Sequence, residues 1–378
     1  MDLATLMNLP FGYVLPFLVA ITIIVFVHEY GHFQVARWCG VKVEAFSIGF
    51  GREVFGWVDR HGTRWKFCWL PLGGYVRFEG DANAASMPGQ EQDQSQRGPG
   101  DFHSKPIWQR AAVVAAGPFA NFLLAIFIFT AAYSIVGVPY SEPRVDEVMP
   151  DSAAQAAGLQ AGDFIRKVDG KDTKSFAEVQ EMVWQQAGVP LAVVVERAGS
   201  KIELTLTPRI QELPDGFGGT LKVGLLGVRH NPGTDEPLYE RYSVPEALAK
   251  GLERTWYIIA TTGRYVSKLF TGAESIDQIG GPIAMAKGAG DTASSGGLAF
   301  ISFVALLSVS IGLINLFPVP MLDGGHLVFY AVEALRGKPL GPNAQEWGYR
   351  IGFSFVVMLM LIGIWNDVAR TISVVLGS

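Results

Sequence analysis

The sequence is poor in charged residues and has almost no cysteine. Only 17% of its 378 residues are charged, whereas about 25% is usual in soluble domains. Its two cysteines cannot build a disulfide scaffold, and a net charge of -5 argues against a protein that binds nucleic acid through bulk electrostatics. With 49% hydrophobic residues and a mean hydropathy of +0.26, the chain is not intrinsically disordered either. This composition is typical of a membrane protein.

Long stretches without charge predict membrane-spanning helices, each of which needs about 20 apolar residues. Residues 3–27, 111–141 and 292–322 contain no charged side chain, and a fourth apolar stretch, 351–376, is crossed by Asp367. The first dozen residues contain no Lys or Arg, so the first stretch lacks the basic region of a cleavable signal peptide and is expected to remain as an anchor. We therefore place four transmembrane segments at residues 1–37, 107–140, 292–335 and 350–376.

The positions of basic residues predict how these segments are oriented. Lys42, Arg60 and Arg110 are among the basic residues between the first two segments, and Arg336 lies between the last two. Cytoplasmic loops carry an excess of Lys and Arg near the ends of spanning helices. We therefore expect both loops to face the cytoplasm, and both termini and the segment 141–291 to lie outside it.

The loop between the first two segments, residues 38–106, predicts a β-hairpin followed by a linker. Val41–Val58 and Thr63–Phe78 alternate apolar and polar residues around the turn Asp59-Arg60-His61-Gly62. Residues 80–104 are rich in Gly, Ser, Gln and Asp, which is typical of a flexible linker.

Residues 141–230 predict a small α+β domain outside the cytoplasm. Short strand-like runs surround one helix-like run at Phe176–Gln186. The segment "PDSAAQAAGLQAGDFIRKVDG" resembles part of a PDZ domain, with glycines where turns need a positive φ. A PDZ fold implies a groove that takes an extended peptide by strand addition. The alternative is a rigid domain that binds nothing.

The next segment, residues 231–291, predicts an amphipathic helix and a loop. Leu248, Leu252 and Trp256 recur at helical spacing, whereas basic residues such as Lys250 lie elsewhere around the helix. Such a helix either lies on the membrane surface or packs on the small domain, and the sequence favours neither.

The most specific chemical pattern is HExxH at residues 28–32. At about 100° per residue, His28, Glu29 and His32 lie on one face of a helix. Two imidazoles one turn apart can hold a single zinc ion, with the glutamate as general base. The pattern interrupts an apolar spanning segment, where ionisable residues are costly and indicate a functional site. The alternative is a polar helix end whose histidines are merely solvated.

A zinc site with an open coordination position needs a third protein ligand, and Asp323 is the best candidate. Asp323 follows Pro318 and Pro320 in the segment "NLFPVPMLDGGH", where the prolines break the third spanning segment. Unwound backbone at membrane depth is tolerated only where it lines a cavity. We therefore expect Asp323 to face the first helix, with a helix-capping role as the alternative. His326 is the rival third ligand.

These features, together with five further motifs, resemble the site-2 protease family of intramembrane zinc metalloproteases. The resemblance covers nearly the whole chain and is closest to the bacterial regulator-of-sigma-E branch of that family. The further motifs are "SIGFG" at 47–51, "PLGGYV" at 71–76, "AGPFANF" at 116–122, "GGPIAMAKGAG" at 280–290 and "NDVAR" at 366–370. Several motifs in the same order are far more specific than HExxH alone.

The expected fold is a polytopic α-helical membrane protein with about four transmembrane helices, a membrane-associated β-hairpin and one inserted PDZ-like α+β domain. The resemblance implies a zinc endopeptidase of the bacterial inner membrane. Such an enzyme cuts transmembrane segments of single-span proteins, for example an anti-sigma factor, after another protease has shortened their ectodomain. Its expected partners are these substrates, the lipid bilayer, and a peptide or ectodomain at the PDZ-like domain, with no nucleic acid.

The resemblance also implies roles for individual residues. His28 and His32 would bind Zn²⁺ with Asp323 as the third ligand, and Glu29 would be the catalytic base. Asn315 would help to hold the backbone of the substrate. The hairpin would pair with an unwound substrate, because the backbone hydrogen bonds of a helix hide the scissile amide.

The chain departs from this family in two respects. It has one PDZ-like domain where close relatives carry two, so a filter on ectodomain size is expected to be looser. Ser310 stands where the family has a second asparagine, so this substrate-binding position is expected to hold the substrate differently.

Two other classes of protein compete with the enzyme. One is a PDZ-based membrane scaffold or regulator with a non-catalytic metal site, which a missing ligand would favour; yet His28, Glu29, His32 and Asp323 are all present. The other is a metal transporter, which needs polar residues along several spans. The second and third spans are almost free of ionisable groups apart from Asp323, so the sequence favours proteolysis.

Overall fold

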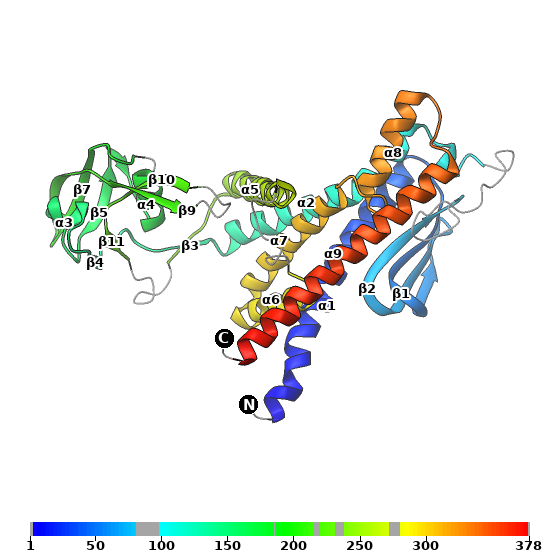
Figure 1. The fold of residues 1–378 in the computed structure, drawn as a ribbon, viewed down its shortest axis with the longest axis horizontal. Coiled ribbons are helices and arrows are strands. Elements are labelled where there is room, and N and C mark those ends of the chain that lie inside the picture. Colours follow the sequence, from blue (N-terminus) through cyan, green and yellow to red (C-terminus); the bar gives the residue numbers. More distant parts are fainter. Residues whose placement is uncertain are drawn as a thin grey trace. The chain divides into compact units, whose positions relative to one another are not determined.

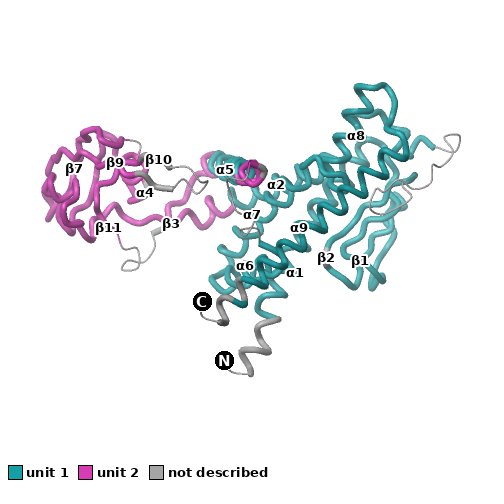
Figure 2. Tube along the Cα trace, in the orientation of Figure 1, with its two compact units in different colours: residues 1–130, 248–264, 275–378 teal, residues 131–247, 265–274 magenta. Residues whose placement is uncertain are grey.

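The computed structural model describes residues 3–80, 98–184, 186–214, 220–230, 238–271 and 280–376. The chain forms two compact units (Figure 2). Unit 1 comprises residues 1–130, 248–264 and 275–378, and unit 2 comprises residues 131–247 and 265–274. Most of the linker predicted at 80–104 lies outside the described residues.

Four helices are long and apolar enough to cross a membrane, as the sequence predicts (Figure 1). Their most apolar windows have a mean hydropathy between 1.9 and 2.4. These helices are α1 (Leu3–Trp38), α2 (Ile107–Ile135), α7 (Gly297–Asn315) and α9 (Pro342–Leu376). Apolar residues surround α2 and α7 on all sides, as expected of helices that contact lipid and one another.

The third predicted segment, 292–335, is not one helix. It contains most of α7 and then α8 (Asp323–Arg336), with a non-helical stretch between them. A separate helix, α6 (Pro282–Ser295), occupies a part of the chain where the sequence predicted a loop. Gly296, with φ 124° and ψ 162°, separates α6 from α7. Only glycine adopts this conformation readily, so the third spanning helix begins at Gly297.

Asp367, the acidic residue in the fourth spanning segment, caps α6. Its carboxylate accepts hydrogen bonds from the backbone N–H groups of Gly281 (3.0 Å), Ile283 (2.9 Å) and Ala284 (3.0 Å). Gly281 precedes α6 and has no side chain to cap it. Asp367 therefore satisfies the first N–H groups of α6 and complements the positive end of its dipole. Its side chain is 3% exposed, and this contact fixes α6 against α9.

The loop after α1 forms two long strands, β1 (Val43–Val58) and β2 (Arg64–Phe78), which pair antiparallel. Because the register shifts midway, the first half of β1 pairs with two parts of β2, an early arm that begins at Arg64 and a late arm that ends at Phe78. Ile48, for example, is opposite Phe67 in the early arm and Gly74 in the late arm. The pairing is therefore more extensive than in the simple hairpin that the alternating pattern predicts.

Aromatic and charged contacts attach this pair of strands to α1. Phe33 of α1 lies 5.2 Å from Trp65 between ring centroids, and Arg37 of α1 binds Asp59 at 2.5 Å. Burial opposes ionisation of Asp59, but hydrogen bonds from Trp65, the backbone of His61 and Arg37 outweigh it and lower the pKa of Asp59 to about 2. The carboxylate therefore stays charged and keeps the turn of the strand pair on α1.

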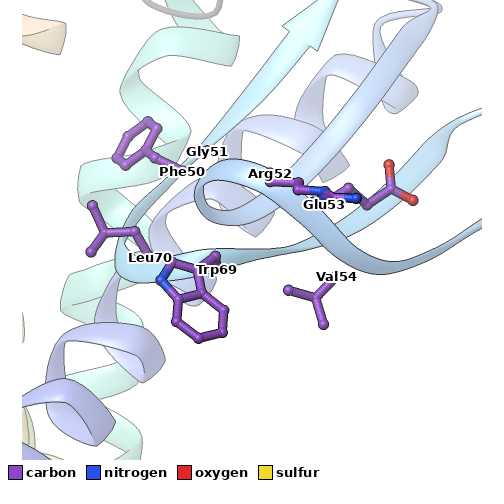
Figure 3. A pocket seen from close by; sticks show the side chains of 7 residues that line it. All are labelled: Phe50, Gly51, Arg52, Glu53, Val54, Trp69 and Leu70. Carbon is purple, nitrogen blue, oxygen red and sulfur yellow. The ribbon is translucent and has the colours of Figure 1, made fainter.

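The far part of the strand pair exposes large apolar side chains. These residues are Phe50, Val54, Phe55, Trp57, Trp69 and Leu70. Where both strands bend, an open hollow of about 910 Å³ is lined by Phe50, Gly51, Arg52, Glu53, Val54, Trp69 and Leu70 (Figure 3). Exposed apolar patches of this kind indicate contact with a membrane or with a partner.

Unit 2 contains a four-stranded sheet in the order β6-β5-β7-β8 and several two-stranded pairs. Its strands are β3 (Val138–Tyr140), β4 (Glu147–Val148), β5 (Phe164–Val168), β6 (Lys171–Asp172), β7 (Leu191–Arg197), β8 (Ser200–Leu206), β9 (Arg209–Pro214), β10 (Thr220–Leu225), β11 (Val228–Arg229) and β12 (Leu238–Glu240). Its helices are α3 (Ala153–Ala156) and α4 (Phe176–Trp184). Val145, Ile165, Val193 and Leu206 belong to a core of its own.

The predicted amphipathic helix is α5 (Val244–Thr271), part of which belongs to each unit. Within unit 1, Gly251 lies against α2, because a Cβ at this position would meet Thr130 Oγ1 at 2.9 Å and the carbonyl oxygen of Ile126 at 3.2 Å. Next to this buried face, Leu252 and Trp256 are 50% and 68% exposed. One face of α5 therefore packs on α2, and a neighbouring apolar stripe remains uncovered by the described residues.

Candidate metal centre

The HExxH motif lies on α1 and brings two histidines together. His28 and His32 are each 9% exposed, and their Nε2 atoms lie 3.1 Å apart. Residues four apart lie one above the other on the same face of a helix, so this proximity follows from local geometry alone. The ring planes are nearly perpendicular, at 83°.

Asp323 reaches this pair from the first turn of α8. The chain between α7 and α8 turns at Val319–Leu322, where the N–H of Leu322 donates to the carbonyl oxygen of Val319. Met321 has a φ of 97° within this turn, a conformation that costs a non-glycine residue about 1 kcal/mol or more. Gly324 permits the close approach that follows, since a Cβ there would overlap the carbonyl oxygen of Leu316. A strained, tightly packed turn thus aims Asp323 at α1.

The distances within the cluster match those of a zinc site. Asp323 Oδ2 lies 3.1 Å from His28 Nε2 and 3.5 Å from His32 Nε2. Two ligand atoms about 2.0 Å from a tetrahedral zinc ion lie about 3.3 Å apart. Asp323 Oδ2 is buried, and no hydrogen bond of acceptable geometry reaches it from the described residues. Three ligand atoms that converge at these distances fit a cation between them.

Helix α2 completes the surroundings of the histidines, which the sequence reasoning did not foresee. The carbonyl oxygen of Val113 lies 2.9 Å from His32 Nδ1, and Asn121 Nδ2 lies 3.3 Å from His28 Nδ1. Gly117 faces both rings: a Cβ at this position would overlap His32 Nε2 and lie 2.9 Å from His28 Nε2. Gly117 and Asn121 belong to the motif "AGPFANF", which was noted only for its family resemblance.

Glu29 lies beside one arm of β2. Glu29 packs against Gly74, since a Cβ added to this glycine would lie 3.3 Å from Glu29 Cγ. The backbone N–H of Val76 donates a hydrogen bond to the Glu29 carboxylate. Thr22 donates to the carbonyl oxygen of Pro71, so this arm runs along α1 toward the cluster. The other side of the arm pairs with the first half of β1. Strand β2 thus places a stretch of backbone next to the three converging ligand atoms.

The remaining predicted site residues have different positions. Asn315 is the last residue of α7 and is half-buried. The hydroxyl of Ser310 donates to the carbonyl oxygen of Leu306 on its own helix, at 3.0 Å. His326 lies 3.4 Å from the hydroxyl of Tyr349 and is not part of the described metal-ligating cluster. Of the two rivals for the third ligand position, the structure brings Asp323 and not His326 to the two histidines.

Comparison with known proteins finds one family and several relatives that match most of the chain. A protein-family model described as Peptidase family M50 matches residues 16–359. A Rhizobium meliloti protein provisionally named a zinc metalloprotease is 48% identical over 361 residues, which cover 94% of this chain and 96% of the relative. The metalloprotease MmpA of Caulobacter vibrioides is 41% identical and covers 93% of this chain and 94% of its own length. A Vibrio cholerae protein, also provisionally named a zinc metalloprotease, is 32% identical, and the match covers 94% of this chain and 98% of the relative.

Among solved structures, the PDZ domain of the SdrC-like protein from Listeria monocytogenes covers 24% of this chain and 88% of its own length. The identity is 22% and the TM-score is 0.20.

The structure combines a cluster of two histidines and one aspartate that could hold a metal ion with helices apolar enough to span a membrane, and this combination fits a metalloprotease. The chain belongs to peptidase family M50, the site-2 protease family, and the resemblance found in the sequence is confirmed.

Proposed function

We propose that the protein is an intramembrane zinc endopeptidase that hydrolyses peptide bonds within transmembrane segments of single-span membrane proteins. The observation that carries the proposal is the convergence of His28, His32 and Asp323 at the spacing of zinc ligands. Glu29 stands next to them, on a helix apolar enough to cross a membrane. This set of groups is what water-dependent cleavage of a peptide bond requires.

The side chains divide the chemistry between them. A zinc ion held by the two histidines and the aspartate would supply Lewis acidity for attack on a peptide carbonyl. Glu29 acts as the general base: its carboxylate takes a proton from the attacking water and later passes it to the departing amine nitrogen. The hydrogen bond to Val113 keeps the lone pair of His32 Nε2 turned toward the cluster.

Substrate binding uses the backbone beside Glu29. A transmembrane helix must unwind before its amide can be attacked, and the arm of β2 from Gly74 to Phe78 offers it strand pairing as a replacement for its helical hydrogen bonds. Asn315 supports the substrate backbone from the end of α7. The hydroxyl of Ser310, turned toward Leu306, makes a weaker contribution than the asparagine found in the family.

The exposed apolar surfaces suggest how the protein sits in a bacterial inner membrane. The aromatic part of β1 and β2 and the apolar stripe of α5 enter or line the lipid, and the termini lie outside the cytoplasm. The sequence of unit 2 supports a PDZ-like domain that meets the ectodomain or a peptide of the substrate. Its hollow between α4 and the β10–β11 region is narrow, about 70 Å³. An anti-sigma factor already cut by another protease is a suitable substrate.

The decisive experiment compares wild type with Glu29→Gln. A single-span reporter with a trimmed ectodomain is incubated with purified full-length protein, and zinc is measured in parallel by elemental analysis. We expect the substitution to lower the cleavage rate at least about 100-fold, because the base is lost, and to leave zinc bound.

The matched control is Glu346→Gln, which changes an exposed carboxylate of α9 paired with Arg350. It should cut at the wild-type rate. Undiminished cleavage by Glu29→Gln would overturn the assignment of the base. Zinc binding without cleavage by wild type would favour the alternative, a membrane scaffold or regulator with a non-catalytic metal site.

A further inference from the structure

Helix α2 contacts both of the helices that carry the metal-ligating side chains. The carbonyl oxygen of Val113 and the Cα of Gly117 lie against the histidines of α1. One turn before Val113, Arg110 binds Glu333 of α8 through two hydrogen bonds, from Nη1 to Oε2 at 3.1 Å and from Nη2 to Oε1 at 2.6 Å. Residues 110 and 117 lie on the same side of α2, because they are almost two full turns apart. One side of α2 therefore joins α1 to α8.

The guanidinium of Arg110 is fixed by all three of its nitrogens. Besides the two hydrogen bonds to Glu333, its Nε donates to the carbonyl oxygen of Lys105, just before α2, at 3.1 Å. The group also lies 4.9 Å from the centroid of the Tyr330 ring. The side chains of Arg110 and Glu333 are 11% and 15% exposed. A bidentate pair of this kind fixes direction as well as distance, so the end of α8 is held at one point of α2.

The other end of α8 carries Asp323. Asp323 and Tyr330 lie on the same side of α8, because they are almost two full turns apart. Tyr330 packs against the core that contains Phe33 of α1 and Val113 of α2. Asp323 and Glu333 are separated by about 15 Å of helix. Because a helix is a rigid element, the point at which Glu333 is held also determines where the Asp323 carboxylate lies.

The turn before α8 is under strain and gives Asp323 little support. Met321 has a φ of 97°, and a non-glycine residue stays in such a conformation where the surrounding structure holds it there. Leu322, the residue before α8, provides no side-chain hydrogen bond to the first turn. The strained turn therefore depends on an anchor elsewhere on α8.

Helix α9 also touches α8, through Tyr349. Its hydroxyl lies 3.4 Å from His326 Nδ1, and its ring meets that of Phe329 nearly at a right angle. A long hydrogen bond and a ring contact fix direction less strictly than a bidentate ion pair does. The contact between Arg110 and Glu333 is thus the stronger constraint on the position of α8.

We propose that Arg110 is a positioning residue that acts through Glu333 to hold the Asp323 carboxylate at ligand distance from the two histidines. The inference rests on the proposed zinc site and extends it, because α2 then sets the place of the third ligand as well as the surroundings of the first two. Without the pair, the first turn of α8 swings away from α1, and the distances of 3.1 Å and 3.5 Å between Asp323 Oδ2 and the imidazoles are lost.

Two variants separate this role from the cost of an unpaired charge. Arg110→Met removes the anchor and leaves Glu333 without its cation. The double variant, Arg110→Met with Glu333→Met, removes both charges, and such replacements leave a fold about as stable as before. We expect both variants to bind zinc about 10-fold to 100-fold more weakly than wild type, because α8 has lost its anchor in each. A purely structural role predicts that the double variant recovers the wild-type zinc affinity.

The matched control is Arg37→Met. Arg37 also lies over an aromatic ring, that of Phe33 at 4.3 Å, and also binds a carboxylate, that of Asp59. It attaches β1 and β2 to α1, and the described metal-ligating cluster has no member on these strands. Its loss should leave the zinc affinity within about 2-fold of the wild-type value.

Zinc affinity is measured on the full-length protein in detergent by competition with a chromophoric zinc chelator. If wild type binds no zinc, the ligand set of the proposed function is wrong. If wild type binds zinc, three results overturn the positioning role while the metal site stands. These are wild-type affinity in Arg110→Met, wild-type affinity in the double variant, and an equal loss of affinity in Arg37→Met.

A second measurement does not depend on zinc. Backbone hydrogen exchange is followed in the presence of a chelator at the first turn of α8, where the N–H groups of Gly325 and His326 donate to the carbonyl oxygen of Leu322. We expect exchange in this turn to be at least about 10-fold faster in the double variant than in wild type. Unchanged exchange there, or faster exchange confined to the last turn around Glu333, would overturn the proposal.

Discussion

Two carboxylates, one in each unit, differ in how completely their oxygens are hydrogen-bonded. In unit 2, the side chain of Asp163 is 0% exposed and both of its oxygens accept hydrogen bonds from Arg197, each at 2.7 Å. In unit 1, Asp323 Oδ2 faces two imidazoles but accepts no well-formed hydrogen bond from the described residues. Removing the partner of a buried charge destabilises a fold, whereas a carboxylate oxygen that accepts no hydrogen bond in a confined space has capacity for a ligand.

The largest expected effect comes from filling that space. Gly117→Ala puts a methyl group where it would overlap His32 Nε2, so the cation has no room between the donors. We expect zinc affinity to fall by more than about 100-fold and reporter cleavage to be lost. Zinc content and cleavage are measured on the same preparation.

Gly12→Ala is the control for this change, because a Cβ at Gly12 of α1 meets no atom within 4 Å. It should bind zinc and cut like wild type. Normal zinc binding by Gly117→Ala would mean that the metal does not sit between these three side chains, and would remove the contrast between the two carboxylates.

An intermediate effect is expected when the paired carboxylate loses its partner. Arg197→Met leaves Asp163 buried and charged without its cation, which costs about 3 kcal/mol. Hydrogen–deuterium exchange of the full chain should show faster exchange in β5, β7 and β8 of unit 2, with the zinc content unchanged.

Arg229→Met tests whether burial is the cause. Arg229 also pairs with a carboxylate, Glu147, but the two side chains are 65% and 57% exposed. This substitution should lower the free energy of opening, as measured by exchange, by less than about 1 kcal/mol. Equal effects of the two substitutions would show that burial does not determine how much these ion pairs contribute to the stability of unit 2.

The smallest expected effect is a loss of stability of unit 2 at low pH. Burial opposes ionisation of Asp163, yet Arg197 and the backbone of Gln160 outweigh it and lower the pKa of Asp163. A lowered pKa contributes stability above the pKa of the unfolded chain, about 3.9, and this stability is lost as the pH falls through the folded pKa.

Exchange in unit 2, corrected for its intrinsic pH dependence, should therefore be constant from about pH 8 to pH 5 and rise below about pH 4. Exchange in the Arg197→Met variant should rise much less over the same pH range, because the ion pair with Asp163 is already absent. A steady change between pH 8 and pH 5 would mean that a group other than Asp163 controls the stability of this unit.

Much of this fold could be predicted because the signals are local. Four uncharged or nearly uncharged stretches marked the four apolar helices, and their length alone is enough for a span. The third segment shows the limit of this reasoning. Hydropathy does not distinguish one helix from α6, α7 and α8, which are divided by Gly296 and by the turn before Asp323. The carboxylate of Asp367, which counted against a span, serves as the cap of α6.

The sequence by itself determined the pair of histidines, because residues four apart on a helix share a face whatever surrounds them. It also indicated Asp323, since proline-broken backbone within an apolar segment must line a cavity. Only the tertiary structure decided that Asp323 reaches the histidines, that His326 turns to Tyr349, and that α2 brings Gly117 and Asn121 against the rings. These contacts join helices far apart in the chain, and such packing depends on shape and hydrogen bonding over the whole unit rather than on any local pattern.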